Sequence, residues 1–420
     1  MFRPSWFPEY SPSEQAIFDN VKNIIEKHYR SFWYDHIYTP AVEANKILLA
    51  KSGNETSKQI FWLYGLAQWS EDLKDYSLHF DLTIPFARYI LDHEWEISFP
   101  FKRYQIQPVR RWERAQRWRY RELRQCDIDT VRRTETKDSM MFYDAETLVV
   151  IANTLEEIRL NYFADKSITL HYNNRRLVNW LLEEYKNRDE IFWLFDKYYK
   201  IWEEKFEEEL KNLTQWEDTE KILNFVKNPK KYLNNSNSEE WIKELLELED
   251  YLEKLNVNKL KFVFDPFITR WLDYYTGSVY ETFIDDDMSL GSISSGWRYD
   301  GLTKYIDAKR NFSGVGWSIG ISRLMALIFE INQWIKQTTT DYMCINFSET
   351  FGDISKIASK LRDEWNNVEI YPVADKLGKQ FWYADKKWIK NVVILWEGEK
   401  DKKIYKIKNM ETWVETQVKL

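Results

Sequence analysis

The sequence predicts an α+β protein in which a large mixed region is followed by a small α/β domain. Three patterns carry this prediction. Segments such as Asp35–Leu48 and Asp75–Leu91 have the pattern of a strand, followed by a turn and then a helix. The stretch Leu181–Leu255 is rich in Glu, Lys and Leu, which is typical of a helical insertion. Beyond Thr340, strand and helix patterns alternate, and this favours βαβ units with a largely parallel sheet.

Helices are expected wherever apolar residues recur every three or four positions. Ser11–His28 has this spacing and predicts an amphipathic helix, and Phe142–Leu160 carries one apolar stripe, most simply a core-facing helix. Extended patterns at Lys259–Pro266 and Gly277–Ile284 predict strands, and a short helix is expected after Ser318. We therefore expect a first core part (1–165), a mainly helical insertion (166–258), a second core part (259–335) and a C-terminal α/β domain (340–420).

Composition excludes several classes of protein. The 420 residues are 44% hydrophobic and carry a formal net charge of −7, so the chain can bury sizeable cores and disorder is not expected. No run approaches the roughly 18 apolar residues of a membrane span, and the N-terminus lacks an apolar signal core, which predicts a cytoplasmic protein. Cys126 and Cys344 lie far apart without metal-ligand spacing, which predicts a reduced compartment and no zinc site.

The segment Pro108–Asp129 concentrates seven arginines in this acidic chain. Guanidinium groups bind phosphate and carboxylate through a planar fork of donors. If the segment is extended, Arg117, Arg119 and Arg121 share one face. A solvated, charged hairpin is the simpler interpretation of such a run alone. However, carboxylates interleave with these arginines, as in a site where acids orient guanidinium groups, whereas a nucleic-acid patch is more uniformly basic.

Several further segments are dense in unusual residues. They are DLT at Asp81–Thr83, RWLDYYTGSVYE at Arg270–Glu281, SSGWRYDGL at Ser294–Leu302 and GVGWSIGISRL at Gly314–Leu324. Together with the arginine block, and in this order, they resemble the histidyl-tRNA synthetases, a class II aminoacyl-tRNA synthetase family. The arginine block resembles motif 2 of that family, GVGWSIGISRL resembles motif 3, and LDYY and RYDGL resemble its two histidine-specific motifs. The resemblance runs essentially from end to end.

This resemblance implies a fold and a reaction. The fold is an antiparallel sheet flanked by helices, with a helical insertion and a C-terminal α/β anticodon-binding domain. The reaction is the ATP-dependent activation of L-histidine and its transfer to the 3′ end of tRNA(His), with Mg²⁺ accompanying ATP. A symmetric homodimer is implied, with an interface near Pro40.

The resemblance also assigns roles to residues. Arg111, Arg270 and Arg323 are expected to be catalytic. ATP binding is expected from Arg111, Glu113, Arg119, Arg121 and Arg323, with Arg111 on the α-phosphate, Arg323 on the γ-phosphate and Glu113 near the adenine. Histidine binding is expected from Asp81, Leu82, Thr83, Arg111, Gln125, Asp129, Arg270, Tyr274, Tyr275 and Tyr299. The acids and amides suit the ammonium group, and the tyrosines suit an imidazole slot.

Two other functions remain open at this point. One is a catalytically silent paralogue that senses histidine or partners a biosynthetic transferase. Such paralogues typically lose motif arginines and often the C-terminal domain, both of which are present here. The other is a general nucleic-acid-binding module, which predicts no ATP chemistry.

One anomaly remains, because the chain has 12 glycines and 21 tryptophans, whereas about 29 glycines are expected at the usual rate of roughly 7%. Tryptophan stands where sequences of the family commonly carry glycine at Trp6, Trp33, Trp95, Trp112, Trp118, Trp271, Trp297, Trp317 and Trp388. Our hypothesis is that UGA codons read as glycine in the cell have been translated as tryptophan. Alternatively, the tryptophans are real and the protein is crippled or repurposed.

Overall fold

The structure is a computed structural model that describes residues 4–50, 57–64, 75–114, 120–135, 139–228, 240–255, 260–269, 275–331 and 338–419. The chain forms two compact units. The first contains Met1–Pro8 and Lys22–Ile331, and the second contains Glu9–Val21 and Asn332–Leu420. In the part of the chain that is described, no helix is long and apolar enough to span a bilayer.

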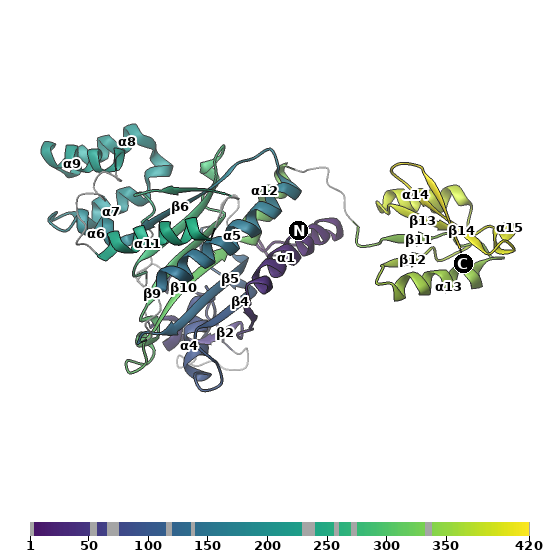
Figure 1. Cartoon of the computed structure of the whole chain (residues 1–420), viewed down its shortest axis with the longest axis horizontal. Coiled ribbons are helices and arrows are strands. Elements are labelled where there is room, and N and C mark those ends of the chain that lie inside the picture. The colour runs from purple at the N-terminus through teal and green to yellow at the C-terminus, as the bar shows by residue number, and fades with distance from the viewer. Residues whose placement is uncertain are drawn as a thin grey trace. The chain divides into compact units, whose positions relative to one another are not determined.

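The first unit is built on an eight-stranded sheet with the strand order β1-β4-β5-β10-β9-β8-β6-β7 (Figure 1). The outer pairs β1–β4 and β6–β7 are parallel, and all other neighbours are antiparallel. The strands are β1 (Asp35–His36), β4 (Phe101–Arg110), β5 (Glu122–Arg133), β6 (Ile168–Asn174), β7 (Lys261–Phe264), β8 (Ser278–Ile284), β9 (Ser294–Asp300) and β10 (Phe312–Ile319). The predicted α+β fold with a large antiparallel sheet is therefore confirmed.

The central strands are covered on both faces. Every residue of β10 is buried, so its sequence FSGVGWSI does not alternate between apolar and polar residues. Helix α5 (Met140–Tyr162) packs on β10 and β5, and it begins where the side chain of Ser139 accepts a hydrogen bond from the Met141 N–H. The other helices of this region are α1 (Pro12–Ser31), α2 (Asn45–Leu48), α4 (Thr83–Asp92) and α12 (Ile321–Ile331). A small sheet is formed by β2 (Val42–Ala44) and β3 (Tyr76–Leu78). Two 3₁₀ turns are η1 (Met288–Leu290) and η2 (Leu302–Tyr305).

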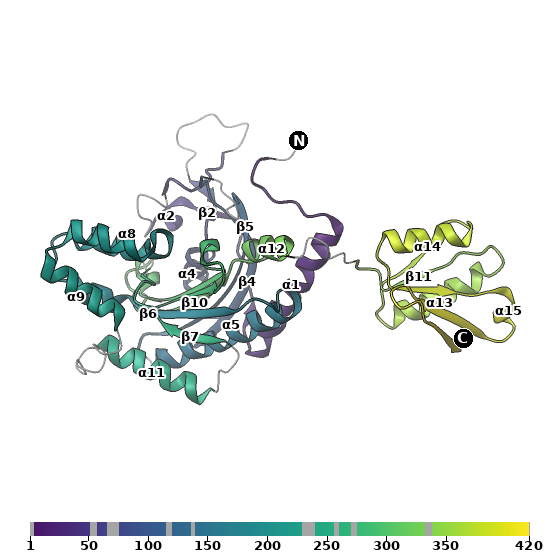
Figure 2. The same cartoon turned by 90° about the horizontal axis from the view of Figure 1, so that it is seen from above.

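Among the described residues between β6 and β7, the chain forms five helices. They are α6 (Arg175–Leu181), α7 (Arg188–Asp196), α8 (Tyr198–Leu213), α9 (Trp216–Lys227) and α11 (Glu240–Lys254). Helix α9 stands away from the sheet, whereas α8 touches it through Tyr199, whose ring centroid lies 5.3 Å from that of Phe283 on β8, and α11 packs against α5 and β6 (Figure 2). The α11 stripe of Ile242, Leu245, Leu248 and Leu252 is buried, as its spacing of three and four residues requires.

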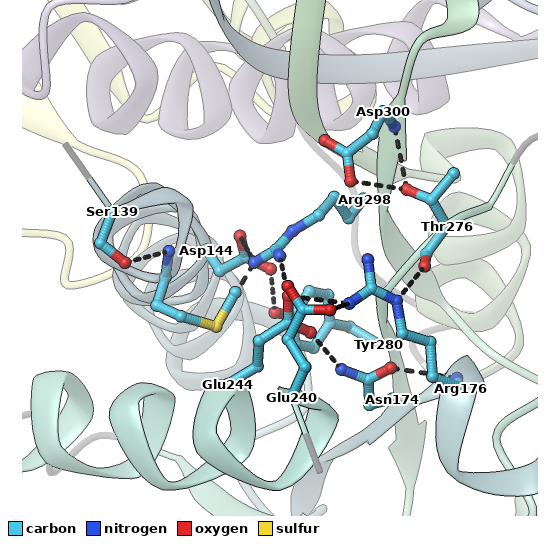
Figure 3. A network of polar contacts seen from close by, with 11 residues as sticks. Ser139, Asp144, Asn174, Arg176, Glu240, Glu244, Thr276, Tyr280, Arg298 and Asp300 are labelled. Atoms are coloured by element: carbon cyan, nitrogen blue, oxygen red, sulfur yellow. Dashed lines mark hydrogen bonds and ion pairs between the residues drawn. The ribbon is translucent and has the colours of Figure 1, made fainter. Parts of the chain in front are cut away.

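A buried ion-pair network ties α11 to the sheet (Figure 3). The guanidinium of Arg298 on β9 is within 2.8 Å of Asp144 on α5 and 2.9 Å of Glu244 on α11. Asp144 also accepts a hydrogen bond from the Tyr280 hydroxyl on β8. Arg298 and Asp144 are almost completely buried, so each charge depends on the other for compensation.

The second unit contains a five-stranded sheet with the order β12-β11-β13-β14-β15. Its strands are β11 (Tyr342–Cys344), β12 (Val368–Ile370), β13 (Asn391–Ile394), β14 (Ile404–Asn409) and β15 (Glu415–Lys419), and its helices are α13 (Phe351–Asp363), α14 (Leu377–Lys386) and α15 (Glu397–Lys400). Helix α13 packs with Cys344, Val393 and Leu395, and α14 packs with the alternate residues Met343, Val392 and Ile394, so the two helices cover opposite faces.

The expectation of a largely parallel sheet in this unit is correct only for β11, β12 and β13. The pairs β13–β14 and β14–β15 are antiparallel. The short turn between β14 and β15 permits no other arrangement, since parallel neighbours need a crossover of a dozen or more residues.

Both cysteines are buried and neither forms a disulfide. Burial raises the pKa of the Cys126 thiol in the first unit. Burial likewise raises the pKa of Cys344, in the second unit, to about 12.

Candidate active site

A polar cavity of about 250 Å³ lies in the first unit, where the ends of β5, β9 and β10 meet the starts of α4 and α12. Seven of the residues predicted for the site line it together: Asp81, Thr83, Arg111, Glu113, Gln125, Tyr275 and Arg323. They come from segments far apart in the sequence. The cavity therefore gathers cationic, anionic and aromatic side chains at one place.

Two arginines reach the cavity from separate elements. Arg111 directly follows β4, and its Nε donates to the carbonyl oxygen of Phe80 at 2.9 Å. Its backbone N–H donates to the carbonyl oxygen of Arg121, so both the backbone and the side chain of Arg111 are held by hydrogen bonds. Arg323 lies in the first turn of α12 and donates to the carbonyl oxygen of Ser292. Both guanidinium groups are thus oriented by backbone acceptors before any ligand binds.

The acid and amide side chains of the cavity are also held in place. Oδ1 of Asp81 accepts a hydrogen bond from the Ile84 N–H at 3.2 Å, which fixes the buried carboxylate at the start of α4. Thr83 is the first residue of this helix and is buried. The Gln125 side-chain amide donates to the Ser318 hydroxyl at 3.1 Å, across the β5–β10 pair. These groups offer oxygens to a small cationic ligand.

Asp129 and Tyr299 form a second polar cluster beside the cavity, but neither residue lines it. The Tyr299 hydroxyl donates to Oδ1 of Asp129 at 2.7 Å, and Arg103 on β4 lies 2.6 Å from the other carboxylate oxygen. All three residues are buried. Burial raises the pKa of Asp129 to about 7, although the guanidinium of Arg103 opposes this shift.

The two side chains meet above β10 because the strand carries glycine there. A Cβ at Gly316 would lie 2.2 Å from Oδ1 of Asp129, and one at Gly314 would lie 2.5 Å from the Tyr299 ring. The neighbouring carboxyl of Asp127 has its pKa raised to about 6, also by burial. These buried side chains therefore form a compact polar cluster that does not line the cavity.

Trp297 lies between the cavity and the polar cluster of Asp129 and Tyr299. Ser295, Trp297 and Tyr299 alternate along β9 and share one face, and the first two line the cavity whereas Tyr299 does not. In the strand register, Gly316 of β10 lies between Trp297 on β9 and Asp129 on β5. Its ring centroid is 5.1 Å from that of Tyr275. The indole thus fills the space between Tyr275 and the Asp129–Tyr299 pair.

The remaining predicted residues lie elsewhere. Leu82 is fully buried and does not line the cavity. Arg121 does not line it either, and its guanidinium lies 4.1 Å from the centroid of the Trp112 ring. Arg119, Arg270 and Tyr274, together with the extended run at Arg117, fall outside the described residues. Of the other tryptophans at glycine-type positions, Trp95 and Trp112 are exposed and do not line the cavity, and Trp118 and Trp271 fall outside the described residues.

Several cavity residues were missed by sequence reasoning. They are Gln59, Phe80, Tyr120, Leu123, Arg124, Ser292, Ile293, Ser294, Ser295, Ser318, Gly320 and Ser322. The run SISS before Trp297 was the available signal, since small polar residues in a strand provide hydroxyls without bulk. Within the described ranges, no group of three His, Cys, Asp or Glu side chains is placed to hold a metal ion.

Comparison with known proteins places this geometry in a family. Residues 7–324 match the family model described as histidyl-tRNA synthetase, and residues 343–420 match the anticodon binding domain. The histidine–tRNA ligase of Clostridium tetani is 35% identical, over 97% of this chain and 93% of that protein. The crystal structure of histidyl-tRNA synthetase from Nostoc sp. PCC 7120 is 30% identical and superposes with a TM-score of 0.86, covering 99% of this chain and 96% of that one.

A more distant likeness concerns the fold alone. A structure from Bacillus halodurans described as an ATP phosphoribosyltransferase regulatory subunit/histidyl-tRNA synthetase is 20% identical, with a TM-score of 0.73 over 94% of this chain and 98% of that one. The antiparallel sheet with its arginine-lined cavity, joined to an anticodon-binding domain, defines an aminoacyl-tRNA synthetase. The chain belongs to the histidyl-tRNA synthetase family.

Proposed function

We propose that this chain is a histidine–tRNA ligase that activates L-histidine with ATP and transfers it to the 3′ end of tRNA(His). The observation that carries the proposal is the cavity in which Arg111 and Arg323 converge with Asp81, Gln125 and Tyr275. Polyanion and amino-acid binding groups thus share one space. The near full-length identity to named histidine–tRNA ligases supports the same conclusion.

The first step joins histidine to AMP. A carboxylate oxygen of histidine attacks the α-phosphorus of ATP, a P–O bond forms, and pyrophosphate leaves with the electrons of the broken bond. Negative charge develops around phosphorus, so fixed cations stabilise the transition state. Arg111 is assigned to the α-phosphate and the histidine carboxylate, Arg323 to the γ-phosphate, and Glu113 to the adenine. Mg²⁺ enters as part of the nucleotide substrate and neutralises its phosphates.

The amino acid is assigned to the other end of the cavity. Asp81, Thr83 and Gln125 offer oxygens to the ammonium group, and Tyr275 provides an aromatic wall. The imidazole is assigned to Tyr299 and to Asp129, which the family resemblance had placed at the ammonium group, because this hydroxyl and carboxylate form one pair that can contact the two ring nitrogens. A hydrogen-bonding slot of this kind rejects apolar side chains, because its buried polar groups would stay unsatisfied.

The second step and the assembly rest on the family. The match of residues 343–420 to an anticodon-binding domain supports tRNA(His) as the partner of the second unit. A homodimer with an interface near Pro40 and a cytoplasmic location are proposed on the same basis. The histidine-sensing paralogue is less supported, since Arg111 and Arg323 both line the cavity and the relative with that description shares only the fold.

Histidine-dependent exchange of pyrophosphate into ATP tests this proposal. The assay is run without tRNA on the chain with its tryptophans and on Trp297→Gly, because Trp297 separates the cavity from the assigned imidazole site. Exchange by at least one form, followed by charging of tRNA(His), is the expected result. Exchange should disappear when Arg111→Ala is added to the active form. A failure to exchange by a form with glycine at all the suspect tryptophans, with ATP and histidine at saturating levels, would contradict the assignment.

A further inference from the structure

Tryptophan dominates the left-handed backbone positions of this chain. In the described parts, six residues other than glycine have a positive φ, and five of them are tryptophans: Trp6 (69°), Trp33 (63°), Trp365 (65°), Trp388 (61°) and Trp413 (62°). The sixth is Lys403. Positive φ is uncommon for L-residues, and where it occurs asparagine and aspartate are the enriched types. A bulky aromatic residue gains nothing from this conformation, so its repetition requires a cause.

Three of these tryptophans occupy the same place in a helix-ending motif. After α1, the Trp33 N–H donates to the Arg30 carbonyl and the Tyr34 N–H donates to the Tyr29 carbonyl. This pair of bonds, with a left-handed residue just beyond the helix, is the Schellman arrangement.

The arrangement recurs in the second unit. After α13, Trp365 and Asn366 donate to the carbonyls of Arg362 and Leu361. After α14, Trp388 and Ile389 donate to the carbonyls of Asp385 and Ala384. The left-handed position of this motif is usually glycine, because glycine has no Cβ to clash with the following carbonyl oxygen.

The side chains do not explain why tryptophan should stand there. Trp33 is 88% exposed and Trp365 is 96% exposed, so their indoles bury almost no apolar surface. Trp6, Trp388 and Trp413 are also exposed. A strained backbone conformation normally persists because packing or function compensates for it. At Trp33 and Trp365 the packing needed for such compensation is missing.

Trp297 supplies an independent observation inside the site. Its φ is not left-handed, but its indole fills the space between Tyr275 and the Asp129–Tyr299 pair. Glycine there would leave the face of β10 open above Gly316. The cavity of about 250 Å³ would then continue to Asp129 and Tyr299.

We propose that glycine occupies these six positions in the working protein, because their codons are UGA and the cell reads UGA as glycine. The positions are Trp6, Trp33, Trp297, Trp365, Trp388 and Trp413. Trp365 and Trp413 join the set on backbone geometry alone. The consequence for position 297 rests on the proposed function, whereas the argument from φ does not. Glycine at 297 therefore determines whether the site can accept an imidazole.

Peptide mass spectrometry of the protein purified from its own cells tests the proposal directly. Peptides that span Trp33, Trp365 and Trp388 should have the mass given by glycine, and the gene should carry UGA at each of these positions. Peptides with the mass of tryptophan, or UGG codons at these positions, would overturn the proposal.

Thermal unfolding of variants tests the backbone argument. Trp388→Gly should raise the melting temperature of the second unit by about 4–8 °C, because relief of about 1 kcal/mol of left-handed strain gives this shift in a unit of about 100 residues. Trp382→Gly is the matched control, because Trp382 is also exposed but lies inside the same helix, α14. It should lower the melting temperature, since glycine weakens a helix interior. Equal changes in both variants would contradict the argument.

A second pair of variants distinguishes the effect of backbone strain on the melting temperature from the effect of losing an exposed indole. Trp33→Gly and Trp33→Ala both remove the ring, but only glycine removes the Cβ that clashes in the left-handed region. The melting temperature should therefore rise clearly more for Trp33→Gly than for Trp33→Ala. Equal gains would mean that the ring, and not the backbone, is responsible.

Pyrophosphate exchange tests position 297 separately. Trp297→Gly should increase histidine-dependent exchange at least 100-fold, mainly through the KM for histidine, while the KM for ATP changes little. Trp297→Ala should recover only part of this gain, because the Cβ of alanine still projects toward the Asp129–Tyr299 pair. If the chain with Trp297 exchanges as fast as Trp297→Gly, the proposal for this position fails and the ligase function stands. If a form with glycine at all the suspect tryptophans also fails to exchange, the ligase function itself fails, and the mass and melting tests still decide the other five positions.

Discussion

The hydroxyl of Tyr299 donates to the carboxylate of Asp129 at 2.7 Å. The two side chains meet over Gly314 and Gly316 of β10, where a Cβ would clash with them. The pair lies beyond Trp297, at the end of the polar cavity. This relationship ties the proposed imidazole site to a titratable group whose ionisation is linked to folding.

The stability of the protein should depend on the ionisation of Asp129. Burial raises its folded-state pKa to about 7, above an unfolded value of about 3.9. The protonated form is therefore favoured in the fold, and this contribution is complete below pH 4 and is lost as the pH rises through 7. Melting temperatures of the protein and of Asp129→Asn, measured from pH 5 to pH 8, should diverge, with the smaller decline in the variant. Parallel curves would rule out the raised pKa.

Arg111 should contribute mainly to the rate of adenylate formation. Loss of one preorganised charge at a transition state typically lowers kcat by about 10²–10³-fold. We expect this loss for Arg111→Ala in pyrophosphate exchange, measured in the form of the protein that exchanges. Arg111→Lys should recover little, since an ammonium cannot reproduce the fork that is anchored at Phe80. A melting temperature within a few degrees of the parent shows that the loss is not unfolding.

Arg323 and Arg270 should differ in which kinetic constant they affect. The γ-phosphate is bound in the ground state and in the transition state, so Arg323→Ala should mainly raise the KM for ATP, by about tenfold or more. Arg270→Ala should mainly lower kcat, because its predicted partner is the reacting α-phosphate. Steady-state exchange at varied ATP separates the two effects. Equal changes of KM and kcat in both variants would contradict these roles.

The buried network around Arg298 should be strongly coupled. Arg298→Met leaves Asp144 buried without its cation, which should lower the free energy of unfolding by about 3–5 kcal/mol. Arg298→Met with Asp144→Asn should recover part of this loss, because both charges are then absent. Glu244→Gln, on the α11 side of the network, should cost only about 1 kcal/mol. Urea unfolding of these three variants and of Asp144→Asn alone measures the coupling, and additive losses would show that there is none.

Part of the predicted site lies together in the structure. Asp81, Thr83, Arg111 and Arg323 line one cavity, and they were named from the resemblance of their motifs to those of the family. The antiparallel C-terminal edge was missed, because β14 and β15 were not predicted as strands and the short connection between them was therefore not considered. The network at Arg298 was also missed, since its partners lie on α5, β8 and α11 and no local pattern connects them.

The tryptophans show where sequence and structure had to be combined. Resemblance to the family marked Trp6, Trp33 and Trp388, and the backbone is left-handed at each of them. Trp95 and Trp112 were marked in the same way, yet neither has a positive φ. Trp365 and Trp413 were not marked, because a glycine requirement at a turn follows from its hydrogen bonds and not from its neighbours in sequence.

The two buried thiols give each compact unit its own reporter. Cys126 belongs to the first unit and Cys344 to the second, and burial keeps both as unreactive thiols. An alkylating reagent can therefore reach either sulfur only when the surrounding unit opens. The rates at which the two positions are alkylated would time the opening of the catalytic and anticodon-binding halves separately, within one intact chain.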